Sequence, residues 1–318
     1  MQDLAGVLLI DKHKGVSSFG IIEHLQRGLR EQSGLKRSEL PKMGHGGTLD
    51  PFATGLLPVC IGRGVKLARY FLGAQKTYEG VMHFGETTVP GDNTAPISER
   101  SEVIPHSLEQ LQELAKRFTA QPYLQTPPMF SAKKIDGKPL YELAREGKEV
   151  EREPKLCHLY EFEILEYQAP DANFRVRSSS GTYVRTLAQD YAKLLGSVAL
   201  LEELRRTATG NLSVKNAWST AQILEATAQG RKLDELDCWT PFNMILDGFA
   251  RVDAHLDEAR ALFKGQQALL FPLLNRVQVK ENSSDTVIAI FHAQELFAVA
   301  RKTEDVWSLE KVFATTSP

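Results

Sequence analysis

The feature that most constrains this chain is the glycine-rich segment at residues 44–58, which reads GHGGTLDPFATGLLP. Three of its first four residues are glycine, so its backbone can approach a ligand closely or adopt positive φ angles. An apolar stretch follows, which predicts a loop that leads into a buried segment. The spacing fits neither a P-loop, because no Gly-Lys-Ser/Thr follows, nor a dinucleotide fingerprint, because no G-x-G-x-x-G pattern is present.

Asp50 lies between the glycines and the apolar stretch, and its surroundings allow two interpretations. It can cap a helix that begins at Pro51, since Asp is favoured at helix N-caps and proline at the first helical position. It can also be a functional carboxylate that the glycine loop holds against a ligand. His45 has the same two interpretations, because a lone loop histidine is more often a hydrogen-bonding group than a functional one.

Hydrophobic periodicity predicts a fold that mixes strands and helices. Residues 7–10 form an apolar run typical of a buried strand, and residues 78–85 form a second strand. Apolar and charged residues alternate at 161–164 and 174–177, which is typical of an antiparallel sheet with one solvated face. Steps of three and four residues predict helices that are capped by Ser18, capped by Ser107, or begin at Val184.

Two further regions interrupt this pattern. Residues 121–155 are polar, basic and proline-bearing, with one short helix near Leu140–Arg145, and we interpret them as an excursion from the core. Residues 249–318 carry a helix at Leu256–Phe263 and several short strands, which predicts a small β-barrel-like domain after a first domain at 1–248. The strands expected in the small domain are Arg276–Lys280, Thr286–Phe291, Leu296–Ala300 and Val306–Leu309.

The string GHGGTLDPFATGLLPV closely resembles the signature of TruB-type tRNA pseudouridine-55 synthases. In that family the Asp of the motif is the catalytic nucleophile, which maps to Asp50. The His of the motif contacts the RNA beside the flipped uridine, which maps to His45. The resemblance is dense over about residues 6–215 and thin beyond 249. Further segments that match in the family's order are 7–18, 76–78, 125–147, 180–188 and 204–210.

These segments imply roles for more residues. Tyr78 resembles the tyrosine that stacks on the target base, and Arg185 resembles the arginine that pairs with the nucleophile. Tyr183 and Leu204 are expected to shape the pocket around the base. The segment 125–147 resembles the family's RNA-gripping insertion, although its charges alone are also typical of a solvated loop. The basic residues expected to hold RNA there include Lys133, Lys134, Lys138, Arg145 and Lys148.

The sequence also departs from the family pattern. His13 stands where a proline is usual, and Phe130 replaces a more usual tyrosine. The family carries an acidic residue and a threonine shortly before Asp92, whereas this chain has Val89 and Pro90. This chain therefore lacks any contact made by that acid, although Asp92 itself is present.

The resemblance implies an α+β pseudouridine synthase fold. We expect a mainly antiparallel mixed sheet flanked by helices, an inserted RNA-gripping segment at 121–155, and a small PUA-like domain at 249–318. The formal net charge is −2, so any RNA surface must come from local clusters of lysine and arginine. Three scattered cysteines argue against a disulfide framework or a zinc site.

The implied reaction requires no metal and no cofactor, because it involves no redox change and no net group transfer. The expected partner is the TΨC stem-loop of tRNA, bound by a monomer. No apolar run of about 18 residues and no signal peptide occur, so we expect a soluble cytoplasmic protein without membrane contact.

Pseudouridine formation breaks a C–N glycosidic bond and rejoins the uracil through C5. A carboxylate suits this covalent chemistry while it is ionised, and Arg185 is expected to hold the pKa of Asp50 down and fix its orientation. The target base must first leave the RNA stack, at a cost that stacking on Tyr78 can partly offset. Because Asp50 and Arg185 lie far apart in the sequence, only the fold can bring them together.

Two other functions stay open. A non-catalytic tRNA-binding or RNA-chaperone protein would share the RNA surface, but it would not need an ionised carboxylate aimed at a sugar. A guide-RNA-dependent pseudouridine synthase subunit would share the catalytic residues, but such relatives usually carry longer basic extensions at their termini. Activity of the isolated chain on a bare tRNA transcript separates these functions.

Overall fold

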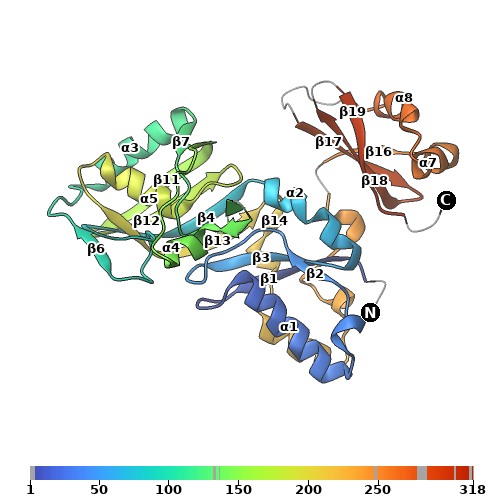
Figure 1. The fold of residues 1–318 in the computed structure, drawn as a ribbon, viewed down its shortest axis with the longest axis horizontal. Coiled ribbons are helices and arrows are strands. Elements are labelled where there is room, and N and C mark those ends of the chain that lie inside the picture. Colours follow the sequence, from blue (N-terminus) through green and yellow to red (C-terminus); the bar gives the residue numbers. More distant parts are fainter. Residues whose placement is uncertain are drawn as a thin grey trace.

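A mixed sheet forms the centre of the molecule (Figure 1). Its strand order along one path is β11-β12-β4-β13-β3-β1-β15, with β14 beside β13 and β2 beside β3. All of these neighbours are antiparallel except β13 and β3, so the predicted mainly antiparallel mixed sheet is confirmed. The computed structural model describes residues 4–131, 134–135, 137–246, 249–277, 285–303, 306–314 and 317.

The strands of this sheet come from segments that are far apart in the sequence. Their bounds are β1 Gly6–Lys12, β2 Met43–His45, β3 Thr54–Ile61, β4 Lys76–Phe84, β11 Leu159–Gln168, β12 Asp171–Ser178, β13 Ala199–Thr209, β14 Leu212–Ser213 and β15 Trp239–Pro241. A separate hairpin follows β4 and consists of β5, Glu86–Thr88, and β6, Ile97–Arg100.

Helices flank the sheet, as the periodicity predicts. Their bounds are α1 Ser18–Ser33, α2 Ala68–Gly73, α3 Leu108–Ala120, α5 Val184–Lys193 and α6 Thr220–Ala228. The expected cap of the first helix is wrong by one residue. Ser17 is the N-cap of α1, because its backbone is extended and its side chain accepts a 3.0 Å hydrogen bond from the Gly20 amide. Ser18 instead turns into the core.

The excursion at 121–155 leaves and rejoins the core through a short ladder. At its base β7, Tyr123–Gln125, pairs antiparallel with β10, Lys155–Cys157. The predicted short helix is α4, Leu140–Arg145, and a two-residue ladder of β8, Lys134–Ile135, and β9, Lys138–Pro139, precedes it. The segment is therefore anchored at both ends.

The C-terminal region forms an open sheet rather than a closed barrel. Its described strands are ordered β16-β17-β18-β19, with no pairing between the outer two. Helices pack on one face and supply its apolar cover, so the sheet does not need to close on itself. The predicted helix at 256–263 is confirmed. The bounds are β16 Ala250–Asp253, α7 Leu256–Phe263, α8 Leu270–Leu274, β17 Asp285–His292, β18 Glu295–Thr303 and β19 Val306–Val312.

The strand expected at 276–280 is not present where the chain is described. Arg276 and Val277 belong to the turn after α8, and residues 278–280 lie outside the described residues. The proposed boundary at 248/249 stays a prediction, because Phe291 and Phe313 of the C-terminal region share the large apolar cluster of the first region.

The three cysteines, Cys60, Cys157 and Cys238, are buried and free. Among the residues that the structure describes, no helix is long and apolar enough to cross a membrane.

Candidate active site

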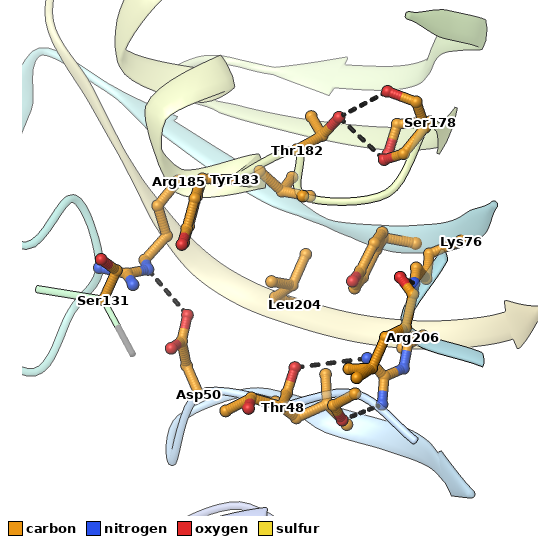
Figure 2. A pocket seen from close by; sticks show the side chains of 17 residues that line it. Thr48, Asp50, Lys76, Ser131, Ser178, Thr182, Tyr183, Arg185, Leu204 and Arg206 are labelled. Atoms are coloured by element: carbon orange, nitrogen blue, oxygen red, sulfur yellow. Dashed lines mark hydrogen bonds and ion pairs between the residues drawn. The ribbon is translucent and has the colours of Figure 1, made fainter. Parts of the chain in front are cut away.

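A pocket of about 270 Å³ opens beside the glycine-rich loop, against β4, β13 and the start of α5 (Figure 2). The sequence predicts eight site residues, drawn from segments throughout the first 204 positions. The fold gathers five of them in the wall of this one pocket. These five are Asp50, Tyr78, Tyr183, Arg185 and Leu204.

The guanidinium of Arg185 points at Asp50. Its Nε donates a 2.8 Å hydrogen bond to Oδ2 of the carboxylate (Figure 2). Oδ2 of Asp92 lies 3.7 Å from the same nitrogen. The other two nitrogens donate to the main-chain carbonyls of Pro90, at 2.6 Å, and Phe130, at 2.7 Å. The Arg185 side chain is 3% exposed while that of Asp50 is 35% exposed, so a fixed cation holds a carboxylate that still reaches the pocket.

The protonation balance of Asp50 differs from the prediction. Burial raises the pKa of Asp50, the Arg185 cation opposes this, and Asp92 raises the pKa further. The causes that raise the pKa outweigh those that lower it, so the carboxyl group titrates above its ordinary range. Arg185 does lower the Asp50 pKa as expected, but burial, which is not visible in the sequence of a loop, opposes it.

The helix-cap interpretation of Asp50 is wrong. No helix follows Pro51, and the chain bends through residues 46–53 directly into β3. Two glycines explain the bend, since Gly47 has a φ of 146° and Gly55 a φ of 99°, values that side chains rarely allow. The glycines therefore shape the loop that presents the carboxylate.

Buried polar side chains fix the residues on both sides of Asp50. The Ser18 hydroxyl donates to the Leu49 carbonyl at 3.1 Å and accepts from the Leu49 amide at 2.8 Å. The Lys12 ammonium donates to the Pro51 carbonyl at 3.2 Å, and burial lowers the pKa of Lys12 to about 8. The main chain at the carboxylate is thus held from two directions.

The apolar and aromatic wall faces this ion pair. Tyr78 on β4 is 9% exposed, and Leu204 on β13 is nearly buried. Tyr183 is the N-cap residue of α5, and the residues just before it, at 178–179 and 181–182, also line the pocket. Burial raises the pKa of the Tyr183 hydroxyl, so this group stays protonated at neutral pH. The pocket therefore sets this ion pair beside a largely apolar wall, and Lys76 and Arg206 also belong to its lining.

Three predicted residues do not line the pocket as described. His45 ends β2 outside the lining, and its buried Nδ1 has no hydrogen-bond partner within the described part of the chain. Lys133 lies outside the described residues, and Lys134 is placed only by its backbone in β8. Of the described residues, no group of three or more His, Cys, Asp or Glu side chains could hold a metal ion.

The sequence did not predict several contacts of the site. The carbonyls of Pro90 and Phe130 hold Arg185, yet a main-chain carbonyl leaves no signal in a sequence. Pro90 also stands where the family pattern differs, and its main-chain carbonyl accepts a hydrogen bond from the guanidinium. Lys76 and Arg206 line the pocket too, and their place inside the matched segments 76–78 and 204–210 was the only available signal.

Comparison with known proteins points to one family. Residues 35–184 match the family model for the TruB family pseudouridylate synthase, N-terminal domain. The chain is 36% identical over 315 residues to tRNA pseudouridine synthase B of Burkholderia lata, covering 99% of this chain and 92% of the relative. It is 44% identical over 218 residues to the protein of the same name from Bordetella avium, covering 68% of this chain and 85% of the relative.

Solved structures share the fold at lower identity. A chain from the crystal structure of a Cbf5-Nop10-Gar1 complex superposes with a TM-score of 0.70 and 22% identity, over 97% of this chain and 85% of that chain. A chain from the archaeal box H/ACA sRNP Nop10-Cbf5 complex gives a TM-score of 0.69 and 21% identity, over 97% and 86%. Since full-length relatives exceed 30% identity, this chain belongs to the TruB family of pseudouridylate synthases.

Proposed function

We propose that this protein isomerises uridine-55 in the TΨC loop of tRNA to pseudouridine, with Asp50 as the nucleophile. The observation that carries the proposal is the 2.8 Å pair between Asp50 and the buried Arg185 at one end of the pocket. The name of the relatives, tRNA pseudouridine synthase B, supports tRNA as the substrate. We place the protein as a monomer in the cytoplasm with that tRNA.

Each proposed catalytic group has a defined task. The ionised carboxylate of Asp50 attacks the ribose or the uracil, which breaks the bond between C1′ and N1. The uracil turns in the pocket and rejoins C1′ through C5, and the bond to the Asp50 carboxylate breaks. The C5 proton leaves in the final step with help from the Tyr78 hydroxyl, and N1 takes up a proton. All atoms of the uridine are retained, so the reaction is an isomerisation. Arg185 orients the carboxylate and opposes its protonation.

The apolar wall suits a base that has left its stack. Extrusion of a loop nucleotide costs a few kcal/mol, and an aromatic platform offsets part of that cost. Tyr78 supplies the platform, while Leu204 and Tyr183 limit the space around the ring. The excursion at 121–155 holds the folded RNA through its phosphates and shape, the mode in which base-paired RNA is recognised.

Substitution of Asp50 tests the nucleophile. Asp50→Asn keeps the size of the side chain and removes its charge, so pseudouridine formation should stop while tRNA binding persists. Mass-spectrometric mapping of a treated tRNA transcript measures the product, and a gel-shift titration measures binding. Asp11→Asn is the matched control, because Asp11 also pairs with an arginine, Arg205, but does not line the pocket. Product formation by Asp50→Asn at the wild-type rate rejects the assignment.

The same assay separates the two alternatives. A tRNA-binding or RNA-chaperone protein predicts no pseudouridine from the wild-type chain. A guide-RNA-dependent subunit predicts product only after a guide RNA and partner proteins are added. We expect the isolated wild-type chain to modify a bare transcript.

A further inference from the structure

Arg206 is the largest fully buried side chain of the described residues, and the mechanism above does not use it. It lies on β13, is 1% exposed, and lines the pocket on the side away from Arg185 (Figure 2). No described carboxylate forms an ion pair with it, unlike Arg185 and the neighbouring Arg205. Burying a guanidinium without a counter-charge costs free energy, so its hydrogen bonds to the protein must offset that cost.

All of these hydrogen bonds go to the main chain around the glycine-rich loop. Its terminal nitrogens donate to the carbonyls of Gly47, at 3.0 Å, and Thr48, at 3.4 Å. Its Nε donates to the carbonyl of Leu56 at 2.8 Å. These carbonyls precede and follow Asp50 in the chain, so one rigid planar group ties together both sides of the loop that carries the carboxylate.

The backbone geometry leaves little freedom in this arrangement. Arg206 lies opposite Gly55 in the parallel pairing of β13 and β3. A Cβ at Gly55 would lie 2.3 Å from the Arg206 carbonyl oxygen, and a Cβ at Gly47 would lie 3.4 Å from one guanidinium nitrogen. The two glycines therefore allow the arginine and the loop to approach each other as closely as they do.

We propose that Arg206 is a positioning residue for the reaction, which sets the loop so that the carboxylate of Asp50 meets the reacting uridine. This inference rests on the proposed function. Arg206 acts from one side of the loop and Arg185 from the other, since Arg185 binds the carboxylate itself and Arg206 binds the main chain two and three residues before it. A displacement of about 1 Å in such a site can lower a rate about 100-fold.

The charge of Arg206 has a second consequence. Burial and the nearby Arg206 cation lower the pKa of His45, and the same two causes, with Lys155, lower the pKa of Lys76 to about 7. The guanidinium therefore favours a neutral imidazole at the edge of the loop. A residue that served packing alone would not affect how His45 titrates.

The test compares neighbouring arginines on one strand. Arg206→Lys keeps the charge but cannot bind three carbonyls in a plane, whereas Arg205→Lys alters a half-exposed pair with Asp11. We expect Arg206→Lys to lower kcat on a tRNA transcript about 10- to 100-fold with KM nearly unchanged. Arg205→Lys should change kcat less than about fivefold. Equal kcat values for the two variants, with both folded by circular dichroism, would overturn the proposal.

Two further measurements keep the proposal testable if Arg206→Lys does not fold. Thr48→Gly leaves Arg206 intact and gives the backbone more freedom at the exposed position of the loop, so kcat should again fall while KM holds. An unchanged kcat rejects the positioning role. NMR titration should give a higher His45 pKa in a folded Arg206→Gln variant than in the wild-type protein, and equal values reject the charge effect. A wild-type chain that makes no pseudouridine rejects the proposed function instead.

Discussion

At the scale of single residues, the groups around Asp50 have opposing effects on its pKa. Burial and Asp92 raise the pKa of Asp50, whereas Arg185 and Lys12 lower it, and the raising causes dominate. A nucleophilic carboxylate must be ionised, so the reaction should depend on pH above the ordinary range of an aspartate. Removal of the negative charge of Asp92 should lower the pKa of Asp50 and shift this pH dependence to lower pH.

Asp92→Asn supplies that change. In the wild-type protein kcat/KM should fall as the pH drops through the raised pKa, because protonation removes the nucleophile. Without the Asp92 charge the pKa of Asp50 decreases, so the acidic limb should move to lower pH. The pH profile of kcat/KM on a tRNA transcript measures the shift. Asp171→Asn, at an exposed pair with His83, is the control and should leave the limb in place. A limb that moves to higher pH in Asp92→Asn contradicts the assignment.

Side chains of the site could be predicted from the sequence more readily than their surroundings. The motifs identified Asp50 and Arg185, which the fold brings to 2.8 Å although 135 positions separate them. The carbonyls of Pro90 and Phe130 could not be predicted, because every residue has a carbonyl and only the fold directs it. Burial depth was equally inaccessible, so the lowering effect of Arg185 on the Asp50 pKa could be predicted but the opposing effect of burial could not.

At the scale of elements, the excursion at 121–155 is tied to the catalytic helix. Gln125 ends β7 and is 1% exposed. Its amide oxygen accepts from the Tyr183 backbone nitrogen at 2.7 Å, and its amide nitrogen donates to the Tyr183 carbonyl at 3.0 Å. Tyr183 caps α5, whose first turn carries Arg185. The base of the excursion therefore fixes the helix that positions the arginine.

Gln125→Leu should break this link. The Tyr183 amide then lacks its buried acceptor, so we expect a loss of about 1–3 kcal/mol in the free energy of unfolding and a lower kcat/KM. Urea denaturation and the transcript assay measure the two effects. Leu124→Ala, at the neighbouring exposed position of β7, should change neither by more than a small amount. Full activity in a folded Gln125→Leu variant would show that the excursion and α5 are not coupled.

The helices and strands that could be predicted from the sequence are those with a clear local periodicity. The alternation at 161–164 and 174–177 gave β11 and β12, and helical spacing gave α3 and α5. The errors arose where a neighbour decides the outcome. Ser17 rather than Ser18 caps α1 because Ser18 is taken up by Leu49, and the C-terminal sheet stays open because α7 and α8 cover it.

At the scale of the whole molecule, one carboxylate joins the C-terminal sheet to the catalytic region. Glu310 on β19 pairs with Arg69 of α2 and accepts a 2.7 Å hydrogen bond from the hydroxyl of Tyr70. Arg301 of β18 lies 3.3 Å from the same carboxylate. Phe242 and Phe313 pack edge to face nearby, with ring centroids 5.2 Å apart. An ion pair, a hydrogen bond and an aromatic contact thus join the two regions.

The pH dependence of this junction follows from Glu310. Burial raises the pKa of Glu310, but hydrogen bonds from Tyr70 and Arg69, together with the charges of Arg301 and Arg69, lower it more. The folded protein therefore holds this carboxyl group below its ordinary value of 4.5. A carboxyl group with a lowered folded pKa stabilises the fold fully above the ordinary value. It loses that contribution as the pH falls through the lowered one.

Glu310→Gln should therefore cost stability at pH 7 and progressively less below about pH 4.5. We expect about 1–2 kcal/mol at pH 7, because two cations lose a charged acceptor at a partly buried site. Melting curves of both proteins at several pH values measure the difference. Glu113→Gln is the control, since its pair with Lys116 is exposed on α3 and should contribute about 0.5 kcal/mol or less. A difference that stays constant from pH 7 to pH 3 would show that the Glu310 charge does not hold the two regions together.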